Sequence, residues 1–190
     1  MKTLKNISLG LLMNLVLVPI FLPACSQTNA QKKNESGIDK PAMSIHAAVL
    51  EGNLDVVRQH IKAGSDINEI EPMSGSTPII SAATFDKIEI AKALIEAGAD
   101  LTISNNDGTT PLHSAAFFCR VEIVQLLIDA NADKTIRNDF GATPRETVMG
   151  PFAEIKPIYE MMQQQLAPLG MQLDMEQLEK TRPVIAMMLQ

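Results

Sequence analysis

The side chains that most often carry out chemistry in proteins are few in this sequence and do not cluster. It contains three His and two Cys among 190 residues, which rules out a metal framework built on several Cys or His ligands. Carboxylates are common, but no spacing pairs two of them for acid–base work. Glycine-rich phosphate loops and Gly-x-Ser-x-Gly elbows do not occur in the sequence. We therefore expect no catalytic residues, no cofactor and no enzyme activity.

Methionine offers one alternative chemistry, because thioethers are soft ligands that suit Cu(I). Six of the eleven Met lie near the end of the chain: Met161, Met162, Met171, Met175, Met187 and Met188. The alternative function is therefore a copper-binding protein that uses the first four of these residues. We favour the other interpretation, an apolar cap in which Met fills irregular gaps.

The charge balance narrows the choice of partner. The sequence has 16 Lys and Arg against 22 Asp and Glu, a formal net charge of −6. Lys2 and Lys5 lie in a segment that we expect to be removed, which leaves 14 cations against 22 anions, a net charge of −8. Nucleic acids and anionic membrane surfaces both attract clustered cations. We therefore expect neither as a partner.

The first 24 residues have the pattern of a secretory signal peptide. Lys2 and Lys5 precede an uncharged stretch, residues 7–24, whose centre is apolar. A basic segment followed by an apolar segment of this length is typical of such signals. Prolines and an Asn interrupt the stretch, so we do not expect it to span a membrane as a helix. We assign residues 1–24 to a signal peptide.

The signal ends in Leu-Pro-Ala-Cys at residues 22–25, and this motif resembles the lipobox of bacterial lipoproteins. The resemblance implies that diacylglycerol is attached to the Cys25 thiol, that the chain is cut before this residue and that the new amine is acylated. More than one acyl chain gives stable anchoring. Because Ser26 and not Asp follows, the resemblance implies a periplasmic protein with its lipid anchor in an envelope membrane, with the outer membrane favoured. The alternative is cleavage after Ala30, which gives a soluble periplasmic protein.

Residues 25–42 form a polar segment that is nearly free of large apolar side chains. Such a segment cannot bury enough surface to offset the entropy of ordering, so we expect a flexible tether. The lipid would then be the only contact of the protein with a membrane, and the copper alternative would also act in the periplasm.

The middle of the chain is repetitive. The pair Thr-Pro recurs at residues 77–78, 110–111 and 143–144, a spacing of 33, and an earlier copy without this pair starts near residue 43. The first two pairs precede Ala-Ala, an apolar stretch and Ala-Asp. These residues resemble the ankyrin repeat, in which each unit is a β-turn and two antiparallel helices. The resemblance implies an all-α solenoid over residues 43–150, with three recognisable repeats and a truncated capping repeat, followed by a C-terminal helical cap over residues 151–190.

The repeat also has a physical rationale. Thr110 can cap the first helix of its unit, and Pro111 takes the first helical position, where a missing N–H costs nothing. The Ala pairs let neighbouring first helices pack closely, and Ile123, Leu126 and Leu127 form the apolar stripe of a second helix.

The turn between the two helices of a unit contains Gly52 in the first copy but Asp86 and Cys119 in the next two. If this turn keeps a positive φ, each substitution costs about 1 kcal/mol. With Cys25 lipidated, Cys119 is an odd thiol in an oxidising compartment. We favour a packed thiol over a redox switch.

The three His lie in the repeats. The resemblance implies that His46 and His113 bridge backbone and Thr groups between units, which leaves His60 alone on a second helix.

In the C-terminal segment we expect Pro157 to open a helix that ends at Pro168 and Gly170, followed by a short helix over residues 173–180.

A binding surface remains as the candidate functional site. The resemblance implies that partners bind the hairpin tips and the concave side of the first helices. Large apolar residues aligned there are candidate hot spots, and acidic hairpins suit a basic partner. The candidate partner-binding residues are Leu50, Glu51, Thr84, Phe85, Phe117, Phe118, Asn105, Asn106, Asp107, Asp139 and Phe140. Alternatively, the first helices lean together and shelter these rings, or the C-terminal segment covers them. We expect a monomer that binds another protein.

Overall fold

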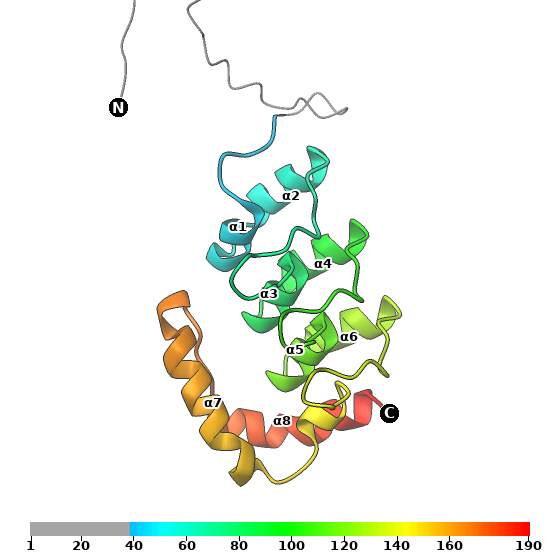
Figure 1. Cartoon of the computed structure of the whole chain (residues 1–190), viewed down its shortest axis with the longest axis vertical. Coiled ribbons are helices and arrows are strands. Elements are labelled where there is room, and N and C mark those ends of the chain that lie inside the picture. The colour runs from blue at the N-terminus through cyan, green and yellow to red at the C-terminus, as the bar shows by residue number, and fades with distance from the viewer. Residues whose placement is uncertain (1–38) are drawn as a thin grey trace, which may run out of the picture. The chain divides into compact units, whose positions relative to one another are not determined.

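The computed structural model describes residues 39–190 (Figure 1). The predicted signal peptide, Cys25 and most of the predicted tether lie outside the described residues. All regular elements within residues 39–190 are helical. They are α1 (Ile45–Glu51), α2 (Leu54–Lys62), α3 (Pro78–Thr84), α4 (Ile88–Glu96), α5 (Pro111–Phe117), α6 (Val121–Asp129), the 3-10 helix η1 (Glu146–Val148), α7 (Phe152–Leu166), the 3-10 helix η2 (Ala167–Leu169) and α8 (Met175–Met188). Among these described residues, no helix is both long and apolar enough to cross a bilayer.

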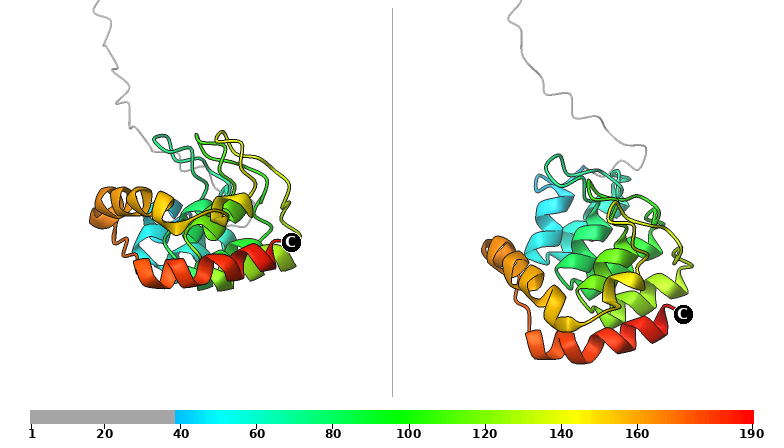
Figure 2. Two further views of the ribbon diagram at one scale, coloured as in Figure 1. Left: turned by 90° about the horizontal axis from the view of Figure 1, so that it is seen from below. Right: turned by 60° about the horizontal axis from the view of Figure 1, so that its bottom comes forward.

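Three helix pairs stack in chain order, as predicted. The inner helices α1, α3 and α5 form one layer and the outer helices α2, α4 and α6 form the other, with hairpin loops between successive units (Figures 1 and 2). Ala115 and Ala116 are completely buried, which agrees with close packing of the inner helices. Ile123 and Leu127 of the predicted outer stripe are also fully buried, whereas Leu126 is only half-buried. The structure is thus an all-α repeat solenoid, with a core that runs continuously through the stack.

The Thr-Pro motif behaves as predicted in the third unit. The Thr110 hydroxyl lies 2.8 Å from Nδ1 of His113, and Nε2 of His113 donates to the Ala142 carbonyl, 3.0 Å away in the next hairpin. His113 therefore bridges two units, and its burial lowers its pKa. The structural role predicted for this residue is consistent with these contacts.

Each of the first two units contains only one of the two residues, Thr and His, that form this bridge in the third unit. In the second, Ile80 stands where His113 stands in the third, and the buried Thr77 hydroxyl has no hydrogen-bond partner among the described residues. In the first, Met43 replaces the Thr, and neither ring nitrogen of His46 has a partner in the described part of the chain. The predicted bridging role is therefore wrong for His46.

His60 has a structural role that the sequence did not reveal. Its side chain is completely buried. Its Nε2 donates to the Met43 carbonyl over 2.8 Å, and its Nδ1 lies 3.0 Å from the Ser65 hydroxyl. The ring therefore ties the segment before α1 to the loop after α2.

The turns inside the units have a positive φ, which is the condition under which we expect each residue other than Gly to cost free energy. The φ angles are 72° at Gly52, 56° at Asp86 and 55° at Cys119. Asn131, which replaces a glycine at the end of α6, has a φ of 59°. The backbone conformation is thus kept in every unit although the residue changes, at a cost of about 1 kcal/mol for each side chain that replaces Gly.

The C-terminal segment differs from the prediction in its helix boundaries. Helix α7 begins at Phe152 and contains Pro157, so Pro157 does not open it. Pro157 is the sixth residue of the helix, so it cannot donate to the Ala153 carbonyl, and tertiary packing must offset this loss. Helix α8 is longer than predicted and runs through Pro183. The end of α7 agrees with the prediction, because η2 follows and Gly170 has a φ of 88°.

The C-terminal helices close the stack and extend beside it. Helix α8 packs against α6 and η1, where an outer helix of the truncated fourth unit would lie. Helix α7 runs back beside the inner helices, as Figures 1 and 2 show. The C-terminal cap is therefore a hook with α8 as its base and α7 as its arm.

The packing between hairpins is testable with two glycines that share a φ of +72°. A Cβ at Gly52 would make only ordinary contact with Lys87, whereas a Cβ at Gly75 would overlap the Asn106 side chain and lie 2.9 Å from its backbone nitrogen. We expect Gly52→Ala to lower the free energy of unfolding by about 1 kcal/mol. We expect Gly75→Ala to lower it by about 2 kcal/mol or more, because the next hairpin must also shift. Equilibrium unfolding in urea measures both losses, and equal losses would contradict close hairpin packing.

Candidate protein-interaction face

The predicted partner-binding residues on the helices lie at the C-terminal ends of the inner helices. Leu50 and Glu51 end α1, Thr84 ends α3 and Phe117 ends α5. Phe85 and Phe118 are the cap residues that follow α3 and α5. The structure therefore brings equivalent positions of the three units to the same side of the stack.

Phe118 is not available to a partner, and its predicted binding role is wrong. Its side chain is only 4% exposed. The ring packs edge-on against Phe117, with 5.1 Å between centroids, and the Arg120 guanidinium lies 6.0 Å from its centre. Phe117 is half-buried and packs against Tyr159 of α7, with 4.6 Å between centroids. The C-terminal segment thus covers part of this face, which was one of the alternatives left open by the sequence.

Tyr159 fixes α7 to the stack. Its side chain is completely buried. Its hydroxyl donates to the Phe117 carbonyl over 2.7 Å and accepts from Nη1 of Arg182 in α8 over 3.0 Å. Arg182 also donates to the carbonyls of Thr147 and Met149. Burial raises the pKa of Tyr159 to about 12, an effect that the nearby Arg182 partly offsets. One hydroxyl therefore connects α5, α7 and α8.

Cys119 lies beside this cluster as a packed thiol. Its Sγ is 3.9 Å from the Leu178 carbonyl of α8, and burial raises its pKa to about 11 although Arg182 and Arg120 oppose the shift. The thiolate is the reactive form, and burial disfavours this form near neutral pH. This favours the packed thiol over the redox switch.

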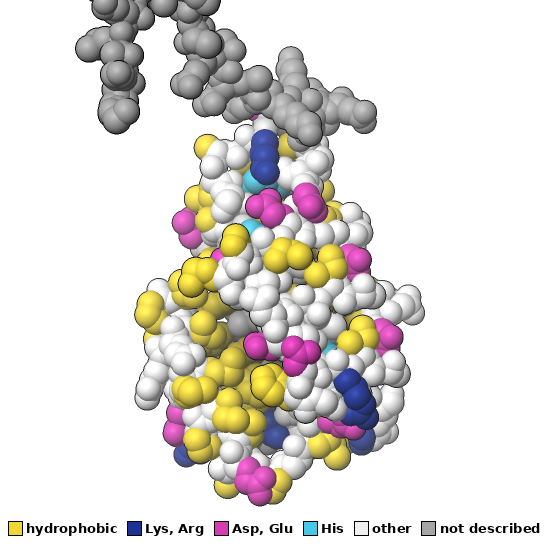
Figure 3. Space-filling view, in the orientation of Figure 1, with side chains coloured by type: hydrophobic (Ala, Val, Ile, Leu, Met, Phe, Trp, Pro, Cys, Tyr) yellow, Lys and Arg dark blue, Asp and Glu magenta, His cyan; other side chains and the backbone are white. Residues whose placement is uncertain are grey.

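The second unit leaves its part of the face open. The Thr84 hydroxyl turns back to the Ile80 carbonyl of its own helix, 2.9 Å away. Thr84 takes the position that Phe117 has in the third unit, and Phe85 is half-buried. On α7, Ile158 and Met161 are 42% and 49% exposed. Figure 3 shows hydrophobic side chains over α7 and the adjoining part of the repeats, around a hollow.

We call this hollow the apolar groove. Phe117 of α5 contacts Tyr159 of α7. The other apolar side chains on the same face of α7 as Tyr159 are Phe152, Ile155, Met162 and Leu166, all of them half-buried. The sequence analysis identified the residues from the repeats but missed those from α7, because no local sequence pattern predicts that α7 lies beside the inner helices.

The hairpins hold one another in register, and this occupies two predicted binding residues. The side-chain oxygen of Asn105 accepts from the backbone N–H groups of Asp107 and Thr109. Asn106 donates from Nδ2 to the Met73 carbonyl of the preceding hairpin over 3.0 Å. Asn105 is thus committed to its own turn and Asn106 to the contact between hairpins, which leaves Asn105 in particular unsuited to binding a partner.

The outer parts of the hairpins expose both carboxylates and apolar side chains. Asp107 and Asp139 are exposed, and Phe140 is 79% exposed. The sequence analysis missed Met73, which is 88% exposed. Its position in the 33-residue period, equivalent to Asn106, could have identified it.

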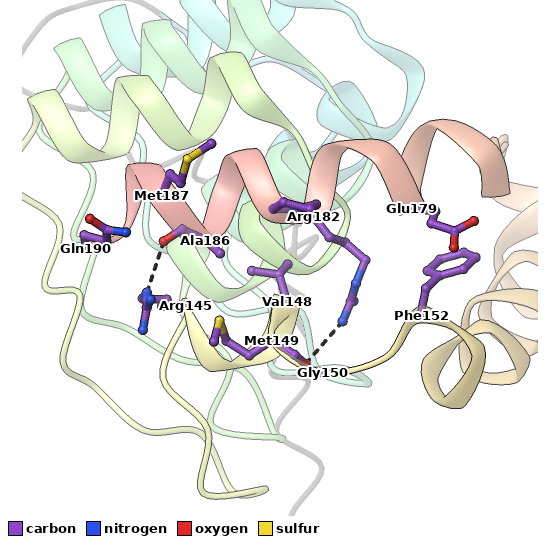
Figure 4. A pocket seen from close by; sticks show the side chains of 11 residues that line it. Arg145, Val148, Met149, Gly150, Phe152, Glu179, Arg182, Ala186, Met187 and Gln190 are labelled. Carbon is purple, nitrogen blue, oxygen red and sulfur yellow. Dashed lines mark hydrogen bonds between the residues drawn. The ribbon is translucent and has the colours of Figure 1, made fainter.

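A second depression lies at the end of the stack, between η1 and α8 (Figure 4). It has a volume of about 440 Å³, and Val148, Met149 and Met187 contribute apolar surface to it. The two guanidiniums that line it join the two sides: Arg145 donates to the Ala186 carbonyl over 3.0 Å and Arg182 to the Met149 carbonyl over 3.3 Å. Both are therefore used in closing the cap, which does not favour a ligand site there.

Metal chemistry finds no support in the part of the chain that the structure describes. No group of three or more His, Cys, Asp and Glu side chains there could hold a metal ion. In the Met set of the copper alternative, Met171 is only 3% exposed and its sulfur lies 3.8 Å from a guanidinium nitrogen of Arg120. A neighbouring cation disfavours a bound Cu(I).

Comparison with known proteins agrees with the repeat geometry. Residues 45–138 match the family model described as ankyrin repeats (3 copies). The human DNA-binding protein RFXANK is 34% identical over 76 residues, which cover 38% of this chain and 29% of that protein. Human protein phosphatase 1 regulatory subunit 27 is 40% identical over 64 residues, covering 34% of this chain and 41% of that protein. The fission yeast ankyrin repeat-containing protein P1E11.10 is 42% identical over 64 residues, 33% of this chain and 29% of its own length. The chain thus spans less than half the length of these relatives.

The Tyr159 contacts predict a loss of stability in Tyr159→Phe. The variant keeps the buried ring but leaves the Phe117 carbonyl and one Arg182 N–H without this partner, so we expect the free energy of unfolding to fall by about 1–3 kcal/mol. Urea unfolding at pH 7 measures this loss. An unchanged midpoint would show that the hydroxyl does not connect the helices.

The pH dependence provides an independent check. Because the folded pKa of Tyr159 is raised from 10 to about 12, the folded state favours the neutral phenol. Its contribution is fully present below pH 10 and is lost as the pH rises through 12. We expect wild type to lose more stability than Tyr159→Phe over this range, and parallel losses would contradict the assignment.

Proposed function

Because residues 45–138 are three ankyrin repeats, we propose that this chain is a non-catalytic module that binds a protein partner on its concave face and hairpin tips. The observation that carries the proposal is the apolar groove, where large apolar side chains stay accessible beside the covered Phe117–Phe118 pair. Accessible apolar side chains grouped on one face are the usual centre of a protein interface. The partner-binding residues in this proposal are Leu50, Glu51, Thr84, Phe85, Phe117, Asn106, Asp107, Asp139 and Phe140, with Met73, Ile158 and Met161 added from the structure.

Charge supports a partner with a basic surface. Residues 39–190 contain 12 Lys and Arg against 21 Asp and Glu. Glu69, Glu71, Asp107 and Asp139 lie in the hairpins, and backbone hydrogen bonds from Ser74 and Met73 lower the pKa of Glu71. Complementary charge speeds association and selects among partners. We propose that the module is a monomer when it binds.

We further propose that the module works in the bacterial envelope. In this proposal the signal peptide directs export, and the lipidated Cys25 anchors the chain to an envelope membrane, with the outer membrane favoured. A soluble periplasmic protein is the alternative. The tether would let the repeats reach a partner near the membrane without lying on it.

The kind of partner follows by analogy only. One relative is named as a regulatory subunit of an enzyme. By analogy, we propose an envelope enzyme that the module shelters or localises, or a toxin that it neutralises by covering its surface.

A pull-down from periplasmic extract tests the binding proposal. The bait is the chain from residue 26 to residue 190, without the predicted signal peptide and the lipidated Cys25, and the test variant adds Phe85→Ser. The control adds Val121→Ser on outer helix α6, where the side chain is 38% exposed. We expect a specific protein to be retained by the bait and the control and reduced at least fivefold by Phe85→Ser. Equal capture by all three would place the interface elsewhere, and capture by none would contradict the proposed function.

Membrane fractionation tests the proposed localisation separately. We expect the wild-type chain to take up labelled fatty acid and to fractionate with the membranes, and Cys25→Ser to take up no label. Release of the unmodified wild-type chain into the soluble periplasm would contradict the anchor and support the soluble alternative.

A further inference from the structure

The hairpins between successive units lie side by side and form one continuous edge (Figure 2). The backbone N–H of Asn106 donates to the Ser74 carbonyl of the preceding hairpin over 3.0 Å. The backbone N–H of Asp139 donates to the Asp107 carbonyl over the same distance, one unit further on. These contacts join equivalent positions of three neighbouring hairpins. We call these positions the hairpin edge, which consists of Met73, Ser74, Asn106, Asp107, Asp139 and Phe140.

Two large apolar side chains lie at the ends of the hairpin edge. Met73 in the first hairpin is 88% exposed and Phe140 in the last is 79% exposed. These are the two highest exposed fractions among the large apolar side chains of residues 39–190. Backbone groups hold the hairpins together, and neither side chain takes part in these contacts. Both are therefore free to pack against a partner.

Two carboxylates lie between these ends. Asp139 has the position that Asn106 has one unit earlier, and its carboxylate lies over the preceding hairpin, since a Cβ at Gly108 would be 2.6 Å from one of its oxygens. Asp107 directly precedes this glycine and is exposed. Neither carboxylate forms an ion pair or a side-chain hydrogen bond with any of the described residues.

The fold does not need a carboxylate at residue 139. The Asn106 side chain donates from Nδ2 to the Met73 carbonyl over 3.0 Å and so joins the first two hairpins. A carboxylate has no N–H to donate, so Asp139 cannot make the equivalent bond to the next hairpin. Asn at this position would satisfy the hairpin contact better than Asp does. A charge that costs the fold a hydrogen bond is typical of a binding site, where function and stability compete.

The hairpins contain no free cation to neutralise these carboxylates. The three hairpins are residues 69–76, 102–109 and 135–142. Arg137 is the only Lys or Arg in these ranges, and it forms an ion pair with Glu146 over 2.6 Å. The hairpin edge therefore complements a basic segment. A guanidinium suits it best, because this group binds carboxylates with two parallel hydrogen bonds and also packs on aromatic rings.

We propose that the hairpin edge binds a segment of the protein partner in which basic side chains lie between two apolar ones. The apolar residues of this segment contact Met73 and Phe140, and its basic residues pair with Asp107 and Asp139. Packed helices lie roughly 8–10 Å apart, so two steps along the stack separate the ends of the edge by about 16–20 Å. An extended segment spans this length with six steps of about 3.3 Å. This inference rests on the proposed function and assigns the chemistry of the bound segment.

Two designed peptides test the inference directly. One has the sequence Leu-Ser-Arg-Ser-Arg-Ser-Leu and a fluorescent label, and the other has Glu in place of both Arg. In an extended chain the Leu and Arg side chains of the first peptide lie on one side. Fluorescence anisotropy measures their binding to the bait of the pull-down. We expect the Arg peptide to bind at least tenfold more tightly than the Glu peptide. Equal affinities, or no binding of the Arg peptide, would overturn the proposal.

Matched charge variants locate the site. The test variant is Asp107→Asn/Asp139→Asn. The control is Glu89→Gln/Glu122→Gln in the first turns of the outer helices α4 and α6, where both side chains are exposed. Each variant loses two negative charges, so a difference between them depends on position. We expect the affinity for the Arg peptide to fall at least fivefold in the test variant and to change less than twofold in the control. Equal effects would overturn the proposal.

The apolar ends of the edge are tested in the same way. We expect Met73→Ser/Phe140→Ser to weaken binding of the Arg peptide at least threefold. The control is Val121→Ser/Val184→Ser, whose side chains are 38% and 40% exposed outside the hairpins. Equal affinities of the two variants would contradict the apolar contacts.

A stability measurement distinguishes a binding role of Asp139 from a structural one. Because Asn at this position has the N–H groups that Asn106 uses, we expect Asp139→Asn to leave the urea midpoint unchanged or to raise it while the Arg peptide binds more weakly. A lower midpoint would show that the carboxylate serves the fold, and it would overturn the proposal.

The pull-down separates this inference from the proposed function. If the captured partner is lost with Phe85→Ser but retained with Asp107→Asn/Asp139→Asn, the module binds its partner without the hairpin edge, and only the further inference fails. If both variants lose the partner while the Glu89→Gln/Glu122→Gln control retains it, both proposals are supported.

Discussion

The hydroxyl of Tyr159 is the point on which the arrangement of the candidate site depends. It joins the last inner helix, the arm and the capping helix through the Phe117 carbonyl and Arg182. The contact with Arg182 is buried and the contact with the Phe117 carbonyl is part-buried, so leaving these groups without their partners costs free energy. Tyr159 is also the only buried side chain of α7, so its ring and its hydroxyl together hold this helix beside the inner helices. The stack needs α8 to cover its last unit, whereas α7 contributes mainly to the shape of the surface.

The repeats themselves vary in how completely they satisfy their own motif. The third unit has both Thr110 and His113 and therefore a complete hydrogen-bonded bridge to the next hairpin. The second has only Thr77 and the first only His46, and in both the remaining polar atoms lack partners among the described residues. Buried polar atoms without partners cost free energy. In a stack whose units contact only their neighbours, we expect these atoms to lower the stability of the first two units.

Local features of the sequence were sufficient to predict the repeats. The 33-residue spacing predicted the helix pairs. It also aligned Asp86 and Cys119 with Gly52, and all three residues have a positive φ in the structure. The hook could not be predicted in this way, because its contacts join distant residues. Tyr159 contacts Phe117, which lies 42 positions earlier in the sequence, and this contact covers Phe117. Phe118 is covered by Phe117 and by the Arg120 guanidinium. The predicted bounds of α7 and α8 were also wrong, because Pro157 and Pro183 lie inside these helices. Tertiary packing tolerates a proline that local propensity disfavours. For the candidate site, the sequence therefore provided the repeat side of the groove and missed the α7 side.

The most direct test of the account is amide hydrogen exchange of the full chain with and without the protein captured from the periplasm. The account predicts slower exchange in α7, over Phe152–Leu166, and at the end of α3 when the partner is bound. It predicts no change in the outer helices α2 and α4. Protection confined to the outer helices, with α7 unchanged, would contradict the claim that the arm and the repeats together form the binding site.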